Sequence, residues 1–123
     1  MEQEDKDLLL RDLCARLPYG VKCYKMTFKP ELAEEVICML RNGSHNCVQL
    51  GTFLYRLEHI KPYLFPLSSM TDEQYREFLS TCNGYCDYYW TEETFDWLNK
   101  NHFDYRGLIP MGLAEDATDK NIY

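Results

Sequence analysis

The residues best suited to chemistry gather in one short segment near the C-terminal end of the sequence. His102, Asp104, Tyr105 and Arg106 bring an imidazole, a carboxylate, a phenol and a guanidinium close together. In an extended chain His102 and Asp104 would lie on one face, because side chains two positions apart point the same way. Arg106 could hold a carboxylate or a phosphate through two parallel hydrogen bonds. The segment is therefore a candidate binding site.

The same residues also fit a structural role, and this alternative stays open. A histidine at a helix end can contact the last backbone carbonyls, where its positive charge meets the helix dipole. Asp104 and Arg106 could form a local ion pair, and the apolar residues around them would attach the segment to the core. We expect Arg106 to be such an anchor, fixed by Asp104 or by a carboxylate on a helix.

Catalytic motifs are missing from the rest of the sequence. It contains no recognisable nucleophile elbow and no phosphate-binding loop. His45 and His59 are the other imidazoles, and their predicted places in a turn and near a strand end make them surface residues. The sequence thus favours a non-enzymatic protein with no catalytic residue and no cofactor.

Six cysteines raise the question of disulfides or a metal site: Cys14, Cys23, Cys38, Cys47, Cys82 and Cys86. The last two form the only close pair, but their C-x3-C spacing differs from the C-x2-C of zinc and redox sites, and no second pair follows. The chain opens on acidic residues rather than on a secretion signal, so reduced thiols are expected. We predict six free thiols, mostly buried as small apolar side chains, and no metal site.

Eight aromatic residues crowd positions 85–105: Tyr85, Tyr88, Tyr89, Trp90, Phe95, Trp97, Phe103 and Tyr105. Three of them, Tyr88, Tyr89 and Trp90, are consecutive and cannot all face inward. The rings either form an aromatic core with one exposed member or present a patch to a partner protein or a second copy of the chain. Tyr88, Tyr89 and Trp90 are therefore candidate binding residues as well, and a homo-oligomer stays open.

The charge of the chain is concentrated in its C-terminal half. The whole sequence has a net charge of −7, and residues 71–123 hold 11 acidic and 4 basic side chains. An acidic surface repels phosphate backbones, so direct binding to nucleic acid is disfavoured. The acidic half is either an ordinary solvated surface or a face that docks on a basic protein.

Membrane insertion and secretion are not predicted. No apolar run reaches the about 18 residues that a bilayer span requires. Residues 1–5 are acidic, whereas a secretion signal starts with basic and then apolar residues. At 123 residues and 46% hydrophobic content, the chain suits one soluble, cytoplasmic domain that does not contact a membrane.

Residues 5–60 predict one helix followed by strands. Residues 5–17 form an amphipathic pattern, with Leu10, Leu13, Cys14 and Leu17 at helical spacing. Residues 20–60 predict a small antiparallel sheet of three to four strands, with an Asn-Gly turn at 42–43. A short helix over 30–36 is an alternative, because good helix formers follow Pro30.

Residues 60–123 predict a connector, two helices and an extended end. The two prolines of residues 60–70 argue against a helix and a central strand, so this apolar segment should lie pinned across the domain. Thr71 and Gln74 form a capping box for a helix that Asn83 and Gly84 end. A second helix should start after Thr91 and end near 101, and residues 114–123 should form a frayed polar tail.

Three strings in this order resemble a group of small proteins of gut anaerobes and their phage-like or mobile elements. They are residues 8–21 (LLLRDLCARLPYGV), 60–71 (IKPYLFPLSSMT) and 95–109 (FDWLNKNHFDYRGLI). The resemblance implies a biological context and no mechanism, ligand or site residue.

Together these patterns predict an α+β fold: an N-terminal helix, a small antiparallel sheet, and two C-terminal helices with a final strand or extended segment. We expect one globular domain over residues 1–113. The function that fits best is a non-enzymatic protein-interaction module of a phage-like or mobile element, using its acidic aromatic half to bind a protein partner. The alternative is a small-molecule or nucleotide-binding domain that uses the segment 102–106.

Overall fold

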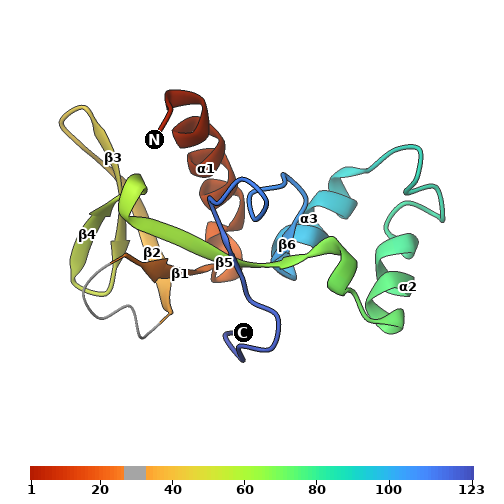
Figure 1. The fold of residues 1–123 in the computed structure, drawn as a ribbon. Coiled ribbons are helices and arrows are strands. Elements are labelled where there is room, and N and C mark those ends of the chain that lie inside the picture. Colours follow the sequence, from red (N-terminus) through yellow and green to blue (C-terminus); the bar gives the residue numbers. More distant parts are fainter. Residues whose placement is uncertain (27–32) are drawn as a thin grey trace.

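The computed structural model describes residues 1–26 and 33–123, and it has the α+β architecture that the sequence predicts (Figure 1). The α-helices are α1 (Gln3–Arg16), α2 (Asp72–Ser80) and α3 (Glu92–Lys100). The strands are β1 (Lys22–Lys25), β2 (Glu34–Asn42), β3 (His45–Leu50), β4 (Phe53–Arg56), β5 (Ile60–Pro66), β6 (Phe103–Asp104) and β7 (Glu115–Asp116). Short 3-10 turns lie at Leu17–Tyr19, Leu57–His59 and Leu67–Ser69.

The strands form one mixed sheet in the order β4-β3-β2-β1-β5-β6, and β7 also pairs with β5. The pairs among β1 to β5 are antiparallel, which confirms the small antiparallel sheet over 20–60, whereas β6 and β7 run parallel to β5. The alternative of a short helix over 30–36 is wrong for residues 34–36, because β2 begins at Glu34. Residues 30–32 lie outside the described residues.

The segment 60–70 contains a central strand, which corrects the expectation that its prolines prevent one. β5 runs across the molecule between the two ends seen in Figure 1. Proline has no amide hydrogen to donate to a neighbouring strand, and the two prolines of β5 lie at a change of partner and at the strand end. Pro62 is the last residue paired with β1, and Tyr63 is the first paired with β7, while Pro66 closes the strand.

Helix α1 packs its Leu9 and Leu13 side chains, both fully buried, into the main core. The sheet and the segments directly before its strands contribute further side chains to the same core: Val21, Cys23, Val36, Val48, Leu50, Leu57, Ile60 and Leu64. The predicted stripe is wrong at Cys14, which is exposed. The buried face of α1 instead repeats as Leu9, Asp12, Leu13 and Arg16, so it carries two charged side chains into the interior.

Helices α2 and α3 begin where the sequence predicts. Thr71 and Thr91 each accept a hydrogen bond from the backbone three residues on, and the side chain at that position bonds back in both cases. These two complete capping boxes fix the helix starts. Helix α2 has no fully buried residue and lies at the end of the molecule opposite β3 and β4 (Figure 1).

Residues 114–123 are attached to the sheet, although their polar composition led us to expect fraying. β7 pairs with β5, and Ala114 and Ala117 are buried. The Tyr123 hydroxyl accepts a hydrogen bond from the Lys22 amide at 2.8 Å and donates one to the Tyr63 carbonyl at 2.9 Å. Two small apolar residues and one aromatic ring thus hold a segment that composition alone describes as polar.

Within the described ranges, none of the helices combines the length and the apolar character that crossing a bilayer would require.

Candidate functional site

His102 lies at the turn between α3 and β6, where the backbone takes a left-handed conformation with φ +62°. Its buried ring stacks on the ring of Tyr123, with centroids 3.6 Å apart. Nδ1 has no hydrogen-bond partner. Burial, together with the positive charges of Arg16 and Lys22, lowers the pKa of His102 to about 4. The imidazole is therefore neutral at pH 7.

Asp104 serves the backbone of the following turn. Its carboxylate accepts hydrogen bonds from the amides of Leu108 and Ile109 at 2.9 and 2.8 Å. No hydrogen bond joins His102 to Asp104, both of which belong to the described residues. The left-handed turn at His102 breaks the extended backbone that would align the two side chains. The structure thus separates the imidazole and the carboxylate that spacing would bring together.

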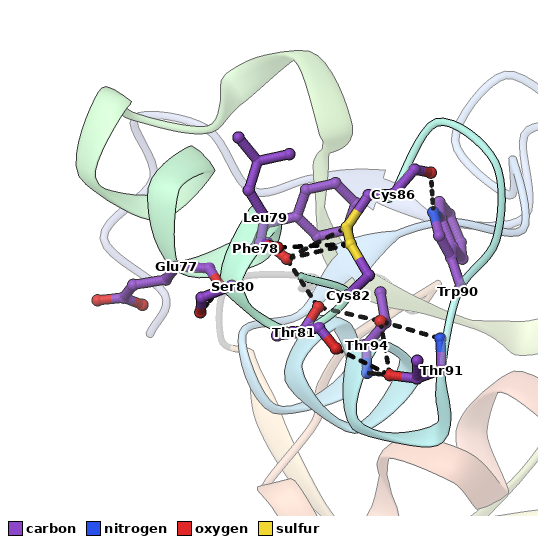
Figure 2. The surroundings of a disulfide bond; sticks show 10 residues. All are labelled: Glu77, Phe78, Leu79, Ser80, Thr81, Cys82, Cys86, Trp90, Thr91 and Thr94. Atoms are coloured by element: carbon purple, nitrogen blue, oxygen red, sulfur yellow. Dashed lines mark hydrogen bonds between the residues drawn. A yellow bond between two sulfur atoms is a disulfide. The ribbon is translucent and has the colours of Figure 1, made fainter. Parts of the chain in front are cut away.

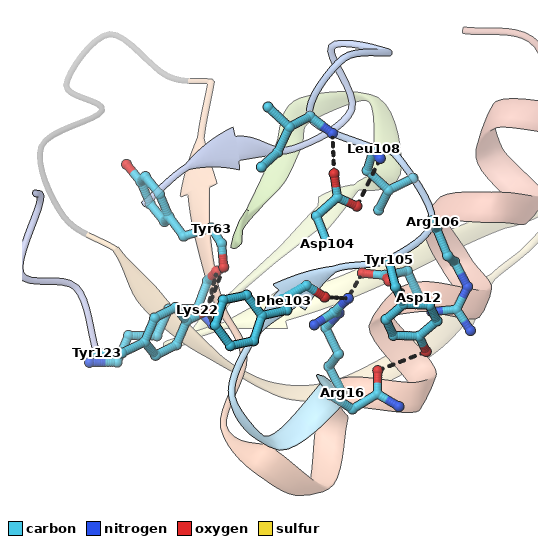
Figure 3. Close-up of polar contacts among 12 residues, drawn as sticks. Asp12, Arg16, Lys22, Tyr63, Phe103, Asp104, Tyr105, Arg106, Leu108 and Tyr123 are labelled. Carbon is cyan, nitrogen blue, oxygen red and sulfur yellow. Dashed lines mark hydrogen bonds and ion pairs between the residues drawn. The ribbon is translucent and has the colours of Figure 1, made fainter. Parts of the chain in front are cut away.

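Arg106 reaches helix α1 (Figure 3). Its Nη1 donates to Oδ1 of Asp12 at 2.8 Å, while Nε of Arg16 donates to Oδ2 of the same carboxylate at 2.9 Å. Arg16 also donates from Nη2 to the Phe103 carbonyl at 2.6 Å. The expectation that Arg106 is anchored by a helix carboxylate is confirmed, and the partner is Asp12 rather than Asp104.

The ring of Tyr105 completes this network. The guanidinium carbons of Arg106 and Arg16 lie 4.6 and 5.3 Å from its centroid. Its hydroxyl donates to the side-chain oxygen of Asn99 on α3 at 2.9 Å. All four candidate residues of the segment 102–106 therefore make contacts inside the fold.

Sequence reasoning missed Asp12, Arg16 and Tyr123. A signal existed for the first two: counted from Leu9, they fall at i+3 and i+7, on the same face as Leu13. An Asp–Arg pair four residues apart on an otherwise apolar helix face indicates a buried ion pair. No comparable signal marks Tyr123.

The loop between α2 and α3 exposes most of its aromatic residues. Tyr85, Tyr88 and Tyr89 have exposed fractions of 55%, 84% and 51%. Trp90 is half-buried and contacts Phe95, Phe78 and Tyr105 through edge-on ring packing. A shallow hollow of about 470 Å³ opens here and is lined by Cys86, Asp87, Tyr88, Tyr89, Trp90 and Phe95. We call these six residues the aromatic hollow.

A disulfide between Cys82 and Cys86 closes the base of this loop (Figure 2). This corrects the prediction of six free thiols. Asn83 and Gly84 both have positive φ, so the chain turns back after α2 and the two Cα atoms come within 5.5 Å. That separation is usual for a disulfide. Cys14, Cys23, Cys38 and Cys47 are free as predicted.

No family model, curated protein or solved structure matches this chain.

The surroundings of the aromatic hollow are acidic. Residues 71–100 contain Asp72, Glu73, Glu77, Asp87, Glu92, Glu93 and Asp96 against only Arg76 and Lys100. Among the described residues, every ion pair lies outside this stretch. Nor do the described residues gather three side chains of the kinds that hold a metal ion. The site thus offers flat rings and unpaired carboxylates.

Proposed function

We propose that this chain is a non-enzymatic protein-interaction module that binds a basic protein surface through the aromatic hollow and the exposed tyrosines beside it. The observation that carries the proposal is the exposure of Tyr85, Tyr88 and Tyr89 on one loop. Tyrosine and tryptophan supply large apolar contact areas with a polar group at the tip, which suits interfaces.

Charge indicates the kind of partner. The carboxylates of Asp87, Glu92, Glu93 and Asp96 stand on or beside the loop without an ion-pair partner among the described residues. Complementary charges speed encounter and select partners. A basic partner surface would satisfy them, and an acidic one would be repelled. The context of a phage-like or mobile element rests on the resemblance of residues 8–21, 60–71 and 95–109.

The alternative, small-molecule or nucleotide binding through residues 102–106, stays a hypothesis. The contacts of these residues within the fold do not favour it, since Asp104, Tyr105 and Arg106 already hold partners.

The test is the capture of partners from a cell lysate with three immobilised proteins. They are the wild type, a Tyr88→Ser/Tyr89→Ser double variant and Phe53→Ser. Phe53 is a matched control, because it is exposed and lies on β4 at the other end of the molecule. We expect a basic protein, identified by mass spectrometry and then purified, to bind the wild type and Phe53→Ser but not the double variant. Binding should weaken as salt rises. Equal capture by all three proteins would overturn the proposal.

A further inference from the structure

We infer that the aromatic hollow binds one arginine side chain of the partner, with the guanidinium against the rings and Asp87 as its counter-ion. This inference rests on the proposed function and specifies the chemistry of recognition at the same site. It is carried by the lining of the hollow, in which one carboxylate stands among four aromatic rings.

Two of the four rings of the hollow, Trp90 and Phe95, are held in place before any partner arrives. Trp90 donates from Nε1 to the Cys86 carbonyl at 2.9 Å, and its ring packs edge-on against Phe95 with centroids 5.4 Å apart (Figure 2 shows the Trp90 contact). The disulfide fixes Cys86 to the end of α2. A preformed site of this kind avoids part of the entropy cost of binding.

Among the described residues, no cation–π pair uses a ring of the hollow. The cation–π pairs that are present lie over Tyr55, Tyr63, Tyr105 and Tyr123. Tyr105 shows how the same fold packs arginine over tyrosine: it lies beneath both Arg16 and Arg106. The hollow presents aromatic rings at the surface, and within the described ranges no guanidinium lies over them.

Arginine fits the hollow better than lysine does. A guanidinium is flat, weakly hydrated and able to stack on aromatic faces while it forms two hydrogen bonds to a carboxylate. The hollow is shallow, and Tyr88 is largely exposed, so it offers flat faces rather than a closed cage. An ammonium group, which keeps its water more strongly, gains less from such a surface.

The experiment follows the indole signals of the protein by NMR during titration with short Gly/Ser peptides. The peptides carry one central arginine, citrulline, lysine or trimethyllysine. The chain has two tryptophans, so a Trp97→Phe variant assigns both indole signals. We expect the arginine peptide to shift the Trp90 signal in a saturable way and to leave Trp97 unshifted. Citrulline has nearly the same shape without the charge and should bind at least about threefold more weakly, the size of an exposed cation–π contact.

Variants distinguish binding in the hollow from a general attraction between the acidic protein and a positively charged peptide. Asp87→Asn removes an exposed ion pair and Tyr89→Ser removes a ring, so each should weaken binding of the arginine peptide by about threefold. Asp72→Asn and Tyr75→Ser, at exposed positions of α2 outside the hollow, should leave the affinity for the arginine peptide unchanged. Equal affinity for arginine and citrulline, tighter binding of lysine or trimethyllysine, or no shift of Trp90 would each overturn the inference. The proposed function fails separately, when the double tyrosine variant captures the same partner as the wild type.

Discussion

Asp12 and Arg106 lie 94 positions apart in the sequence and form a 2.8 Å ion pair that joins helix α1 to the segment after β6. The Asp12 side chain is fully buried, whereas that of Arg106 is 18% exposed. The second oxygen of Asp12 accepts from Arg16, whose side chain is also fully buried. One buried carboxylate therefore balances two guanidinium groups, and its loss would leave both without an ion-pair partner among the described residues.

Asp12→Ala should lower the free energy of unfolding by about 3–5 kcal/mol, because it leaves the buried Arg16 charge uncompensated. Arg106→Ala keeps the Asp12–Arg16 pair and should cost about 1.5–3 kcal/mol, the value of one hydrogen bond to a charged group. Urea unfolding measures both. Asp7→Ala, on an exposed position of the same helix, is the control and should change stability little. If Arg106→Ala kept its stability and lost binding of a ligand, Arg106 would be a ligand contact instead of an anchor.

Local signals in the sequence predict much of this fold. Thr71 and Thr91 lie where capping boxes begin helices, and the Asn-Gly pair at 42–43 joins β2 to β3. Each of these features depends on residues within a few positions of one another. The consecutive aromatics at 88–90 could likewise be recognised as partly exposed, because adjacent side chains point in different directions.

Long-range contacts account for what the sequence does not reveal. The prolines of β5 are tolerated because the strand changes partner at Pro62, and that depends on β7, which lies about fifty residues further on. Tyr123 is held by Lys22 on β1 and Tyr63 on β5, which lie 101 and 60 positions earlier in the sequence. The disulfide is an exception, because Cys82 and Cys86 are only four positions apart. The sequence predicts Asn83 and Gly84 as the end of a helix, but their left-handed turn also brings the two cysteines together.

The two capping threonines should differ in their contributions to stability. Thr71→Ala removes an exposed cap and should cost about 0.5–2 kcal/mol. Thr91→Ala should cost more, because the Thr91 hydroxyl also donates to the Thr81 carbonyl at 3.0 Å and so ties α3 to the end of α2. Denaturant midpoints of the two variants, measured side by side, give the comparison. An unchanged midpoint for Thr71→Ala would contradict the role of the cap.

Thiol titration tests the disulfide directly. Unfolded in denaturant without a reductant, the protein should release four free thiols; with a reductant present it should release six. A Cys82→Ser/Cys86→Ser variant should lose about 2 kcal/mol of stability, the chain-entropy value for so small a ring. Six thiols in the absence of reductant would contradict the bond.

The same variant also links the disulfide to the aromatic hollow. Without the bond, the loop that carries Tyr88 and Tyr89 keeps its own backbone hydrogen bonds and the ring contacts of Trp90, but it loses its covalent closure. We expect weaker binding of the arginine peptide, because the rings must then be ordered during binding. Cys14→Ser, at an exposed cysteine outside the loop, is the control and should bind like the wild type.

His102 should make the stability of the protein depend on pH. Its pKa in the fold is about 4, compared with an ordinary value of 6.5, so the unfolded chain takes up a proton first as the pH falls. The stability from keeping this imidazole neutral is fully present above pH 6.5 and is lost between about pH 6.5 and 4. The loss should amount to at most about 3 kcal/mol over that window.

The comparison variant is His102→Asn, since asparagine also accepts the left-handed φ of +62°. Urea unfolding of both proteins at a series of pH values gives the difference between their free energies of unfolding. The titration of His45, His59 and the carboxylates cancels in that difference. A difference that stays flat from pH 7 to 4 would show that the ring is not held neutral between Tyr123 and the charges of Arg16 and Lys22.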